Sequence, residues 1–289
     1  MELGASEAVK YADSILAAIQ RERLPEEAER GMMRYYCFAN GLVAGVALVG
    51  FTVLAPEQIG VEGDLPVIQT ETEDLIRQGK IKRDKKKSVI LRGEDNSYYE
   101  KIGNKVENID DQIPFELPVG WVWCRGHSCF ESMESTKSQS EFFNYIDIDA
   151  IDNRLHRIKA AKHLLVSEAP SRASRAVKNG SVLFSLVRPY LENIALVEER
   201  YSHCIASTSF YVCNSNGALL PEFMYFLMIS GYMVNSLNQY MKGDNSPSIS
   251  KDNIESWLYP IPPLDEQKVI CTKLNTTFTL IENVGKSLS

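Results

Sequence analysis

The chain has 289 residues, a formal net charge of −7, 44% hydrophobic residues and a mean hydropathy of −0.19. This apolar content is enough to bury a core, which excludes a disordered chain. Six cysteines are too few for a disulfide scaffold in a chain of this length, so they indicate reduced thiols in a cytoplasmic protein. The acidic balance excludes a uniformly basic nucleic-acid-binding domain, and an anionic partner would have to meet a local basic patch.

Residues 1–60 form a first zone, in which we expect a helical and apolar extension of unknown role. Apolar residues recur at three- and four-residue spacing between Ala8 and Ile19, which predicts an amphipathic helix. Residues 35–56 carry no charge, and their core at residues 37–55 is about long enough to span a bilayer. A buried helix or hairpin explains this stretch equally well. One alternative for the whole chain is therefore a membrane-tethered interaction protein anchored by residues 37–55.

Residues 61–111 form a second, polar zone. A short helix is predicted at Glu71–Gln78, and it leads into the lysine-rich run Lys80–Lys87. Between Arg77 and Lys105, ten basic residues face four acidic ones. We interpret this zone as a polar, basic linker.

From residue 112 onward, short strand-like runs alternate with turn signals and helices, which predicts an α+β fold. A helix is predicted at Phe223–Met241. A second helix begins at Leu264, after two prolines, and carries an apolar stripe that requires a partner surface. The strand runs, rich in β-branched and aromatic residues, are Phe142–Ile148, Ser181–Leu186, Ile194–Val197 and Ser207–Val212.

The segment from Arg154 to Lys178 has a local excess of positive charge. It carries seven basic residues against one acidic residue, Glu168. Such a tract in an acidic chain suggests a localised anionic partner, whereas an ordinary solvated surface would show the same charges. Charge alone leaves both interpretations open.

A search for catalytic and cofactor-binding motifs gives no candidate site. The sequence has neither a phosphate-binding loop ending in Gly-Lys-Ser or Gly-Lys-Thr nor a dinucleotide fingerprint. The spacing of Cys124, His127 and Cys129 fits no usual zinc pattern. Asp265 and Glu266, at a helix start, do not converge on one ion. We therefore predict no catalytic residue, metal or cofactor, and a stand-alone nuclease using Asp265 or Glu266 is the enzymatic alternative.

Several short phrases follow one another along residues 75–289. They are LIRQGKIK at residues 75–82, IPFELPVGWVW at 113–123, YIDIDAID at 145–152, VKNGSVLFSLVRPY at 177–190, SPSISK at 246–251 and IPPLDEQK at 261–268. In this order they resemble the target-recognition domain and the following helix of specificity subunits from type I restriction-modification systems. The departures are Ser181, where that family usually has Asp, and Leu186, where a basic residue is common.

The resemblance implies a non-catalytic subunit with one target-recognition domain at residues 112–263 and the family's coiled-coil type helix at residues 264–289. Such a subunit reads one half of a bipartite site in double-stranded DNA and directs a methyltransferase (modification) subunit and a restriction translocase subunit to it. Full specificity subunits have two recognition domains, so this chain resembles a half-length form. The single recognition domain motivates the hypothesis that two copies pair. A silent, truncated recombination product is the alternative. The helix would pack against another subunit through Leu264, Val269, Ile270, Leu274 and Ile281.

The resemblance also turns the basic tract into a set of candidate DNA contacts, because Arg and Lys neutralise phosphates and read guanine in the major groove. Trp121, Trp123 and Trp257 are expected to pack in the core rather than to stack on bases. The candidate DNA-binding residues are Arg154, Arg157, Lys159, Lys162, Arg172, Arg175 and Lys178, with Lys137, Lys242 and Lys251 as loop candidates.

Overall fold

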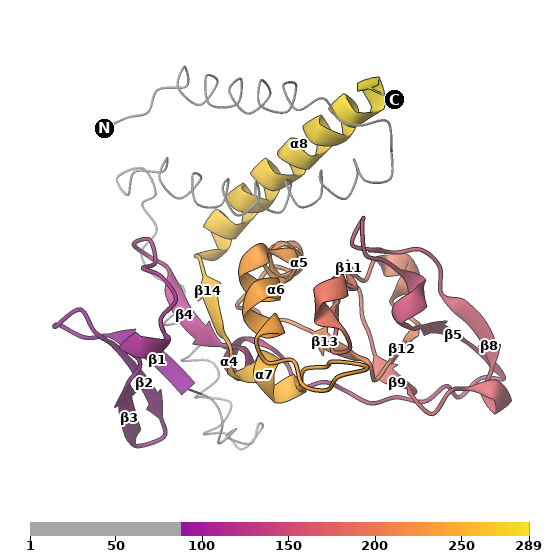
Figure 1. Ribbon diagram of the computed structural model, residues 1–289, viewed down its shortest axis with the longest axis horizontal. Coiled ribbons are helices and arrows are strands. Elements are labelled where there is room, and N and C mark those ends of the chain that lie inside the picture. Colours follow the sequence, from indigo (N-terminus) through magenta and orange to yellow (C-terminus); the bar gives the residue numbers. More distant parts are fainter. Residues whose placement is uncertain (1–87, 289) are drawn as a thin grey trace. The chain divides into compact units, whose positions relative to one another are not determined.

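The computed structural model describes residues 88–288, with side-chain detail up to Thr279 (Figure 1). These residues all belong to one compact unit. The predictions for the N-terminal extension, including the apolar stretch at residues 37–55, and for the helix at residues 71–78 lie outside the described residues. Within residues 88–288, no helix is both long and apolar enough to cross a membrane.

A small antiparallel sheet opens the described part of the chain. It consists of β1 (Ser88–Arg92), β2 (Tyr98–Ile102) and β3 (Lys105–Asn108), in that order. In the β1–β2 turn, Asp95 Oδ1 accepts a hydrogen bond from the backbone N–H of Ser97 at 3.1 Å. The interpretation of residues 61–111 as a linker is therefore wrong from residue 88 onward.

The amino-acid composition of residues 88–108 did not indicate this sheet, because its apolar residues are interspersed with exposed polar ones. Ile90 and Tyr98 are buried, whereas every residue of β3 is exposed. Ile90 and Tyr98 pack with Trp123 and Leu258, which lie on the antiparallel pair β4 (Val122–Arg125) and β14 (Leu258–Ile261). Trp123 is only 2% exposed and Trp121 8%, so the prediction that these two tryptophans pack in the core is confirmed.

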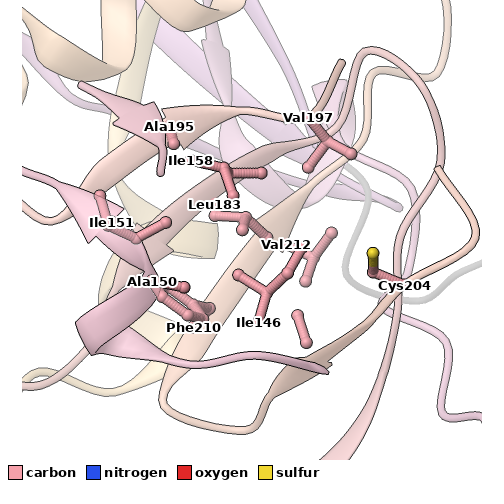
Figure 2. Close-up of a cluster of buried hydrophobic side chains, with 11 residues drawn as sticks. Ile146, Ala150, Ile151, Ile158, Leu183, Ala195, Val197, Cys204, Phe210 and Val212 are labelled. Carbon is pink, nitrogen blue, oxygen red and sulfur yellow. The ribbon is translucent and has the colours of Figure 1, made fainter. Parts of the chain in front are cut away.

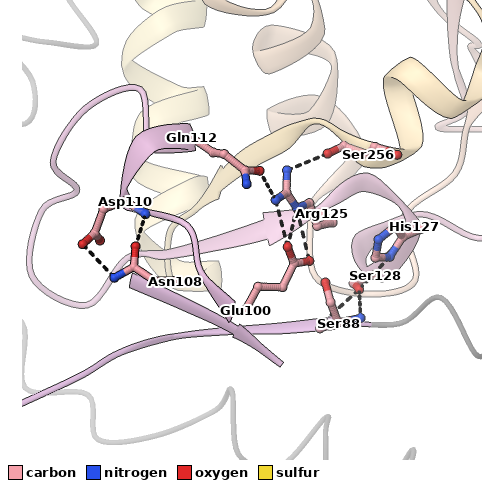
Figure 3. Close-up of polar contacts among 9 residues, drawn as sticks. All are labelled: Ser88, Glu100, Asn108, Asp110, Gln112, Arg125, His127, Ser128 and Ser256. Atoms are coloured by element: carbon pink, nitrogen blue, oxygen red, sulfur yellow. Dashed lines mark hydrogen bonds and ion pairs between the residues drawn. The ribbon is translucent and has the colours of Figure 1, made fainter. Parts of the chain in front are cut away.

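A buried ion pair joins the small sheet to β4 (Figure 3). The guanidinium of Arg125 donates through Nε and Nη2 to the carboxylate of Glu100, at 2.8 to 3.2 Å. It also donates to the carbonyl of Ser256 at 2.8 Å and to Oε1 of Gln112 at 2.6 Å. The side chains of Arg125 and Glu100 are 12% and 10% exposed. One arginine therefore joins segments that are distant in the sequence.

Two further sheets form the centre of the described residues. The first is antiparallel, in the order β11 (Ile194–Leu196), β10 (Val182–Ser185) and β13 (Phe210–Cys213). The second has four strands in the order β8 (Lys162–Leu165), β5 (Phe142–Ile146), β12 (Ile205–Ser207) and β9 (Ala173–Ala176), and only its β5–β12 pair is parallel. A short hairpin, β6 (Ile151–Asp152) and β7 (Arg157–Ile158), lies between β5 and β8 in the sequence.

The main hydrophobic core lies where these elements meet (Figure 2). Leu183 and Phe210 from the three-stranded sheet pack in one cluster with Ile146 and Ala206 from the four-stranded sheet. Ile158 of the hairpin belongs to the same cluster. The core therefore fixes the two sheets and the hairpin relative to one another.

Every residue of β10 is buried because its sheet is covered on both faces. Leu183 faces the cluster, so by strand alternation Val182 and Phe184 face the opposite side. There, the helix α5 (Pro221–Ile229) packs on β10 and β11. Burial on both faces explains why this strand is a continuous apolar run rather than an alternating one.

The turn before β10 accommodates Ser181, which stands where the resembled family phrase usually has Asp. The Oγ of Ser181 accepts a hydrogen bond from the backbone N–H of Lys178 at 2.9 Å and donates to Oδ1 of Asn214 at 2.6 Å. Gly180 has a φ of 84°, and a Cβ there would lie 3.0 Å from the ring of Pro221. Serine thus caps this turn with its side-chain oxygen, as an aspartate can.

The predicted strands at residues 142–148, 181–186 and 194–197 are confirmed as β5, β10 and β11. The predicted strand Ser207–Val212 is wrong, because it joins the end of β12 to most of β13 across a turn. In that turn, the backbone N–H of Ser209 donates to Oγ of Ser207 at 3.1 Å. The local bond lets the chain pass from one sheet to the other.

The predicted single helix at residues 223–241 is also wrong, since two helices occupy it. They are α5 and α6 (Gly231–Asn238), separated by Ser230 in an extended conformation. The Oγ of Ser230 accepts a hydrogen bond from the backbone N–H of Met233 at 3.3 Å. Ser230 thus ends the first helix and caps the second, a role that serine favours.

The final helix is confirmed as α8 (Leu264–Leu288), but part of its apolar stripe is used within the chain. α8 packs on α5, where the rings of Phe226 and Phe278 stack with centroids 5.8 Å apart. Leu274 is only 5% exposed. The expectation that Leu274 contacts another subunit is therefore wrong, because its own chain already covers it.

The other residues expected at a subunit interface differ in exposure. Val269 is 41% exposed, whereas Leu264 and Ile270 are half-buried. The side chain of Ile281 lies outside the described residues. Val269 is thus the exposed apolar position among the four that the structure describes.

We expect Arg125→Ala to lower the free energy of unfolding by about 3 kcal/mol, because it leaves the buried Glu100 carboxylate without its partner. Urea denaturation of the full chain measures this change. The matched control is Arg92→Ala, which removes an exposed pair with Glu116 (45% and 70% exposed) and should cost less than about 1 kcal/mol. Equal losses in the two variants would contradict the structural importance of the buried pair.

The loss of unfolding free energy in Arg125→Ala should also depend on pH. Burial alone would raise the pKa of Glu100, but its hydrogen bonds, led by those from Arg125, hold that pKa below its usual value. A carboxyl group with a lowered folded-state pKa stabilises the fold above its unfolded pKa, about 4.3, and loses that contribution as the pH falls through the folded pKa. The difference between the wild-type chain and Arg125→Ala should therefore narrow below about pH 4.

Candidate nucleic-acid interface

The four-stranded sheet distributes the basic tract over two edges. Lys162 lies on the edge strand β8, and Arg175 lies on the opposite edge strand β9, with Arg172 just before it. β5 and β12 separate these edges, so the sheet spans roughly 14 Å between them at a strand spacing of about 4.8 Å. Basic residues that are close in the sequence therefore lie at opposite edges of one sheet.

Ion pairs neutralise three of the ten candidate cations. The Nζ of Lys162 lies 2.5 Å from Asp147 Oδ2 and 3.6 Å from Asp149 Oδ2. Lys178 pairs with Glu131 at 2.6 Å, and Lys251 with Glu255 at 3.4 Å. The hydrogen bond to Asp147 raises the pKa of Lys162. These lysines would have to leave a carboxylate before they could contact a phosphate.

The other seven candidates form no ion pair with any residue between Ser88 and Thr279. Six of them are exposed and one, Arg175, is half-buried. The Nε of Arg175 is buried and has no hydrogen-bond partner within the described residues. Charge that its own protein does not neutralise remains for an anionic ligand. The seven are Arg154, Arg157, Lys159, Arg172, Arg175, Lys137 and Lys242.

The hairpin β6–β7 positions part of this set. Asp152 Oδ1 accepts hydrogen bonds from the backbone N–H groups of Arg154 and Leu155, both at 3.1 Å, which closes the turn. Arg154 and Arg157 are exposed around this turn. His156, between them, is 4% exposed and 3.7 Å from Glu192, and burial lowers its pKa. His156 therefore belongs to the core, although it lies between two candidate cations in the sequence.

The structure also reveals a polar cluster that the sequence analysis missed. Nδ1 of His163 lies 3.0 Å from Oδ1 of Asn144, and Nδ2 of Asn144 lies 3.0 Å from Nε2 of His203. The ring of Phe142 stacks on His163 with centroids 5.1 Å apart and an angle of 4° between the planes. Asn144 and His203 are 59 positions apart, so no local spacing could reveal the cluster.

Arg188 is a basic loop residue that was not among the candidates chosen from the sequence. Arg188 is exposed, has a φ of 46°, and donates through Nη2 to the carbonyl of Asn245 at 2.9 Å. Lys242 and Ser248 exchange backbone hydrogen bonds at 3.0 Å, which close the same loop. Arg188 thus supports the loop that carries Lys242.

The described residues contain no group of three or more His, Cys, Asp or Glu side chains that could hold a metal ion. Cys129 is buried and burial raises its pKa well above the usual thiol value, so it is a poor metal ligand or nucleophile. Asp265 is exposed and pairs with Lys268 at 2.7 Å.

Comparison with protein families identifies the class. The model of the type I restriction modification DNA specificity domain matches residues 128–288, which is more than half of the chain. The chain therefore belongs to this family, and the resemblance seen in the sequence is confirmed.

Solved structures agree with this assignment. The HsdS subunit from Thermoanaerobacter tengcongensis is 35% identical with a TM-score of 0.56, and the match covers 60% of this chain and 46% of that one. A structure described as the structural basis of complex assembly and conformational transition of the type I R-M system matches with the same values. The predicted α+β fold is thus confirmed.

Curated relatives carry the same description. The type I restriction enzyme EcoAI specificity subunit from Escherichia coli is 23% identical over 72% of this chain and 34% of its own length. The HindI specificity subunit from Haemophilus influenzae is 28% identical over 43% of this chain and 30% of its own length. The match thus spans about a third of the length of these relatives.

Proposed function

We propose that this chain is a non-catalytic specificity subunit that reads one half of a bipartite site in double-stranded DNA. The observation that carries the proposal is the set of seven cations that form no ion pair with any described residue, in a chain that belongs to the DNA specificity family. A DNA-binding protein needs phosphate contacts for position and base contacts for sequence. The unpaired arginines and lysines supply the first kind of contact.

The domain organisation follows from this function. We place the target-recognition domain at residues 112–263 and a subunit-packing helix at residues 264–289. The sheet at residues 88–108 belongs structurally with the first of these, because it packs on Trp123 and Leu258. The protein would work in the cytoplasm, where its DNA partner lies.

The partners that we propose are a modification (methyltransferase) subunit, a restriction translocase subunit and a second copy of this chain. The names of the relatives, which are specificity subunits of restriction enzymes, support the first two. A second copy would supply a second recognition domain, and a two-fold pair would read an interrupted palindrome. The exposed Val269 on α8 is the contact that we assign to this assembly.

Adenine-methylation sequencing of the source genome, with this gene intact and deleted, tests the proposed function. We expect one bipartite methylated motif to disappear when the gene is deleted. A palindromic motif would support two copies in the complex. An unchanged set of motifs would contradict the proposal and favour a silent, truncated gene product.

We expect Arg172→Ala combined with Arg175→Ala to weaken DNA binding and reduce its salt dependence. Each lost phosphate contact removes about 0.9 from the slope of log K against log salt, so the slope should fall by up to about 1.8. Fluorescence anisotropy with duplex DNA at several salt concentrations measures this change. Arg200→Ala is the matched control, since Arg200 is paired with Glu198 at 2.8 Å. An unchanged slope in the double variant would show that these arginines do not meet phosphate.

We expect Val269→Glu to weaken association between copies while leaving the fold intact, because Val269 is 41% exposed and exposed substitutions cost little stability. Sedimentation velocity over a range of concentrations measures the association. Leu274→Ala, at a buried position of the same helix, should instead lower the free energy of unfolding by about 2 to 5 kcal/mol. Identical sedimentation of the wild-type chain and Val269→Glu would contradict the assigned interface.

A further inference from the structure

We propose that Asn144, His163 and His203 form an element that reads base edges in the DNA partner, with the two histidines as the contacting residues and Asn144 as the positioning residue. The inference rests on the DNA-binding function proposed above. It is carried by the hydrogen-bond chain from His163 Nδ1 to Asn144 Oδ1 and from Asn144 Nδ2 to His203 Nε2, each at 3.0 Å.

The amide of Asn144 fixes where each histidine carries its proton. A neutral imidazole has one N–H group and one bare nitrogen. Nδ1 of His163 donates to the amide oxygen, so its Nε2 is a bare acceptor. Nε2 of His203 accepts from the amide nitrogen, so its Nδ1 carries the proton and is a donor. Reversing the amide exchanges these two roles, and the cluster still presents one outer acceptor and one outer donor.

This pattern fits base edges better than the DNA backbone. Phosphate oxygens are acceptors only, so a bare imidazole nitrogen gains no hydrogen bond from them. Base edges in the major groove offer both kinds of group: acceptors on guanine, adenine and thymine, and amino donors on adenine and cytosine. A neutral element with one acceptor and one donor is therefore suited to read sequence.

The surroundings of the cluster agree with this role. His163 and His203 are exposed, and Asn144 is half-buried. Phe142, which is 45% exposed, stacks on the ring of His163 and limits its rotation. Lys162, next to His163 in the sequence, is paired with Asp147, so this candidate cation is already engaged. The unpaired arginines at residues 172 and 175 lie toward the opposite edge of the same sheet.

The two histidines address different groups on the DNA. Their rings contact different atoms of the amide, and their outer nitrogens point away from it. We therefore assign His163 and His203 to different base pairs, and Asn144 to both through its hydrogen bonds.

Long-range ¹H–¹⁵N correlation spectra of the full chain at pH 8 test the cluster without DNA. The chain has four histidines, and single His→Ala variants assign them. We expect His163 and His203 to have the same tautomer, with the proton on Nδ1 in the arrangement described. Asn144→Leu should shift the signals of both rings. Different tautomers in the two rings, or signals that Asn144→Leu leaves unchanged, would overturn the inference.

Selection of binding sites from a random duplex library tests the reading of bases. His163→Ala and His203→Ala should each reduce discrimination about fivefold at a different position of the selected site, as expected for one neutral hydrogen bond. Asn144→Leu should reduce it at both. Affinity for non-selected DNA and its salt slope should not change, which separates this role from phosphate binding. Asn235→Leu, at an exposed position on α6, is the matched control and should select the wild-type sequence.

The outcomes separate this inference from the proposed function. A wild-type chain that selects a sequence which none of the three variants alters would overturn the base-reading role alone. An equal loss of affinity for all sequences would also overturn it, because it indicates backbone contacts. A wild-type chain that selects no sequence would overturn the proposed function and this inference together. Circular dichroism of Asn144→Leu and of Asn144→Asp checks that a change in selection does not result from unfolding.

Discussion

Contact between two short sheets at one buried cluster is the constraint on which the recognition domain depends. Leu183 and Phe210 meet Ile146 and Ala206, and all four side chains are fully buried. No strand of these two sheets is longer than five residues. Strands this short provide few ladder hydrogen bonds, so burial of apolar surface between the sheets must hold them in place. β5 shows the consequence: Ile146 enters the core, while Asn144, on the same face, is left for polar contacts.

Ion pairing determines what the basic tract can do. Exposed salt bridges contribute little to stability, so the pairs of Lys162 with Asp147 and of Lys178 with Glu131 matter mainly because they neutralise charge. The arginines at residues 154, 157, 172 and 175 lack such partners among the described residues, and arginine keeps its charge at any physiological pH. A chain with a net charge of −7 can thus still carry local positive charge that its own described carboxylates do not neutralise.

The sequence was most informative where local pattern decides structure. Each strand or helix that was predicted correctly is one continuous segment of the sequence: β5, β10, β11 and α8. The short phrases that carry the family resemblance are continuous segments too. The sheet at residues 88–108 was missed because its apolar side, Ile90 and Tyr98, packs against residues from elsewhere in the chain, including Trp123 and Leu258. The break at Ser230 was missed because a serine inside an apolar helical pattern becomes a cap only when the chain turns there.

Interactions between residues distant in the sequence also limited how much of the candidate site could be predicted from the sequence. Positive residues could be chosen from the sequence, but their pairing could not, since Lys178 and Glu131 are 47 positions apart. The cluster of Asn144, His163 and His203 has the same origin, because the sheet order brings β8 beside β5 and β5 beside β12, and His203 lies in the turn just before β12. Phosphate binding needs only charge, whereas base reading needs donors and acceptors in fixed positions. The four-stranded sheet separates phosphate binding from base reading. It carries charged residues at both edges, and the asparagine that fixes the histidine tautomers lies on an inner strand. Substitution of the neutral cluster could then change the recognised sequence without changing the affinity for the DNA backbone.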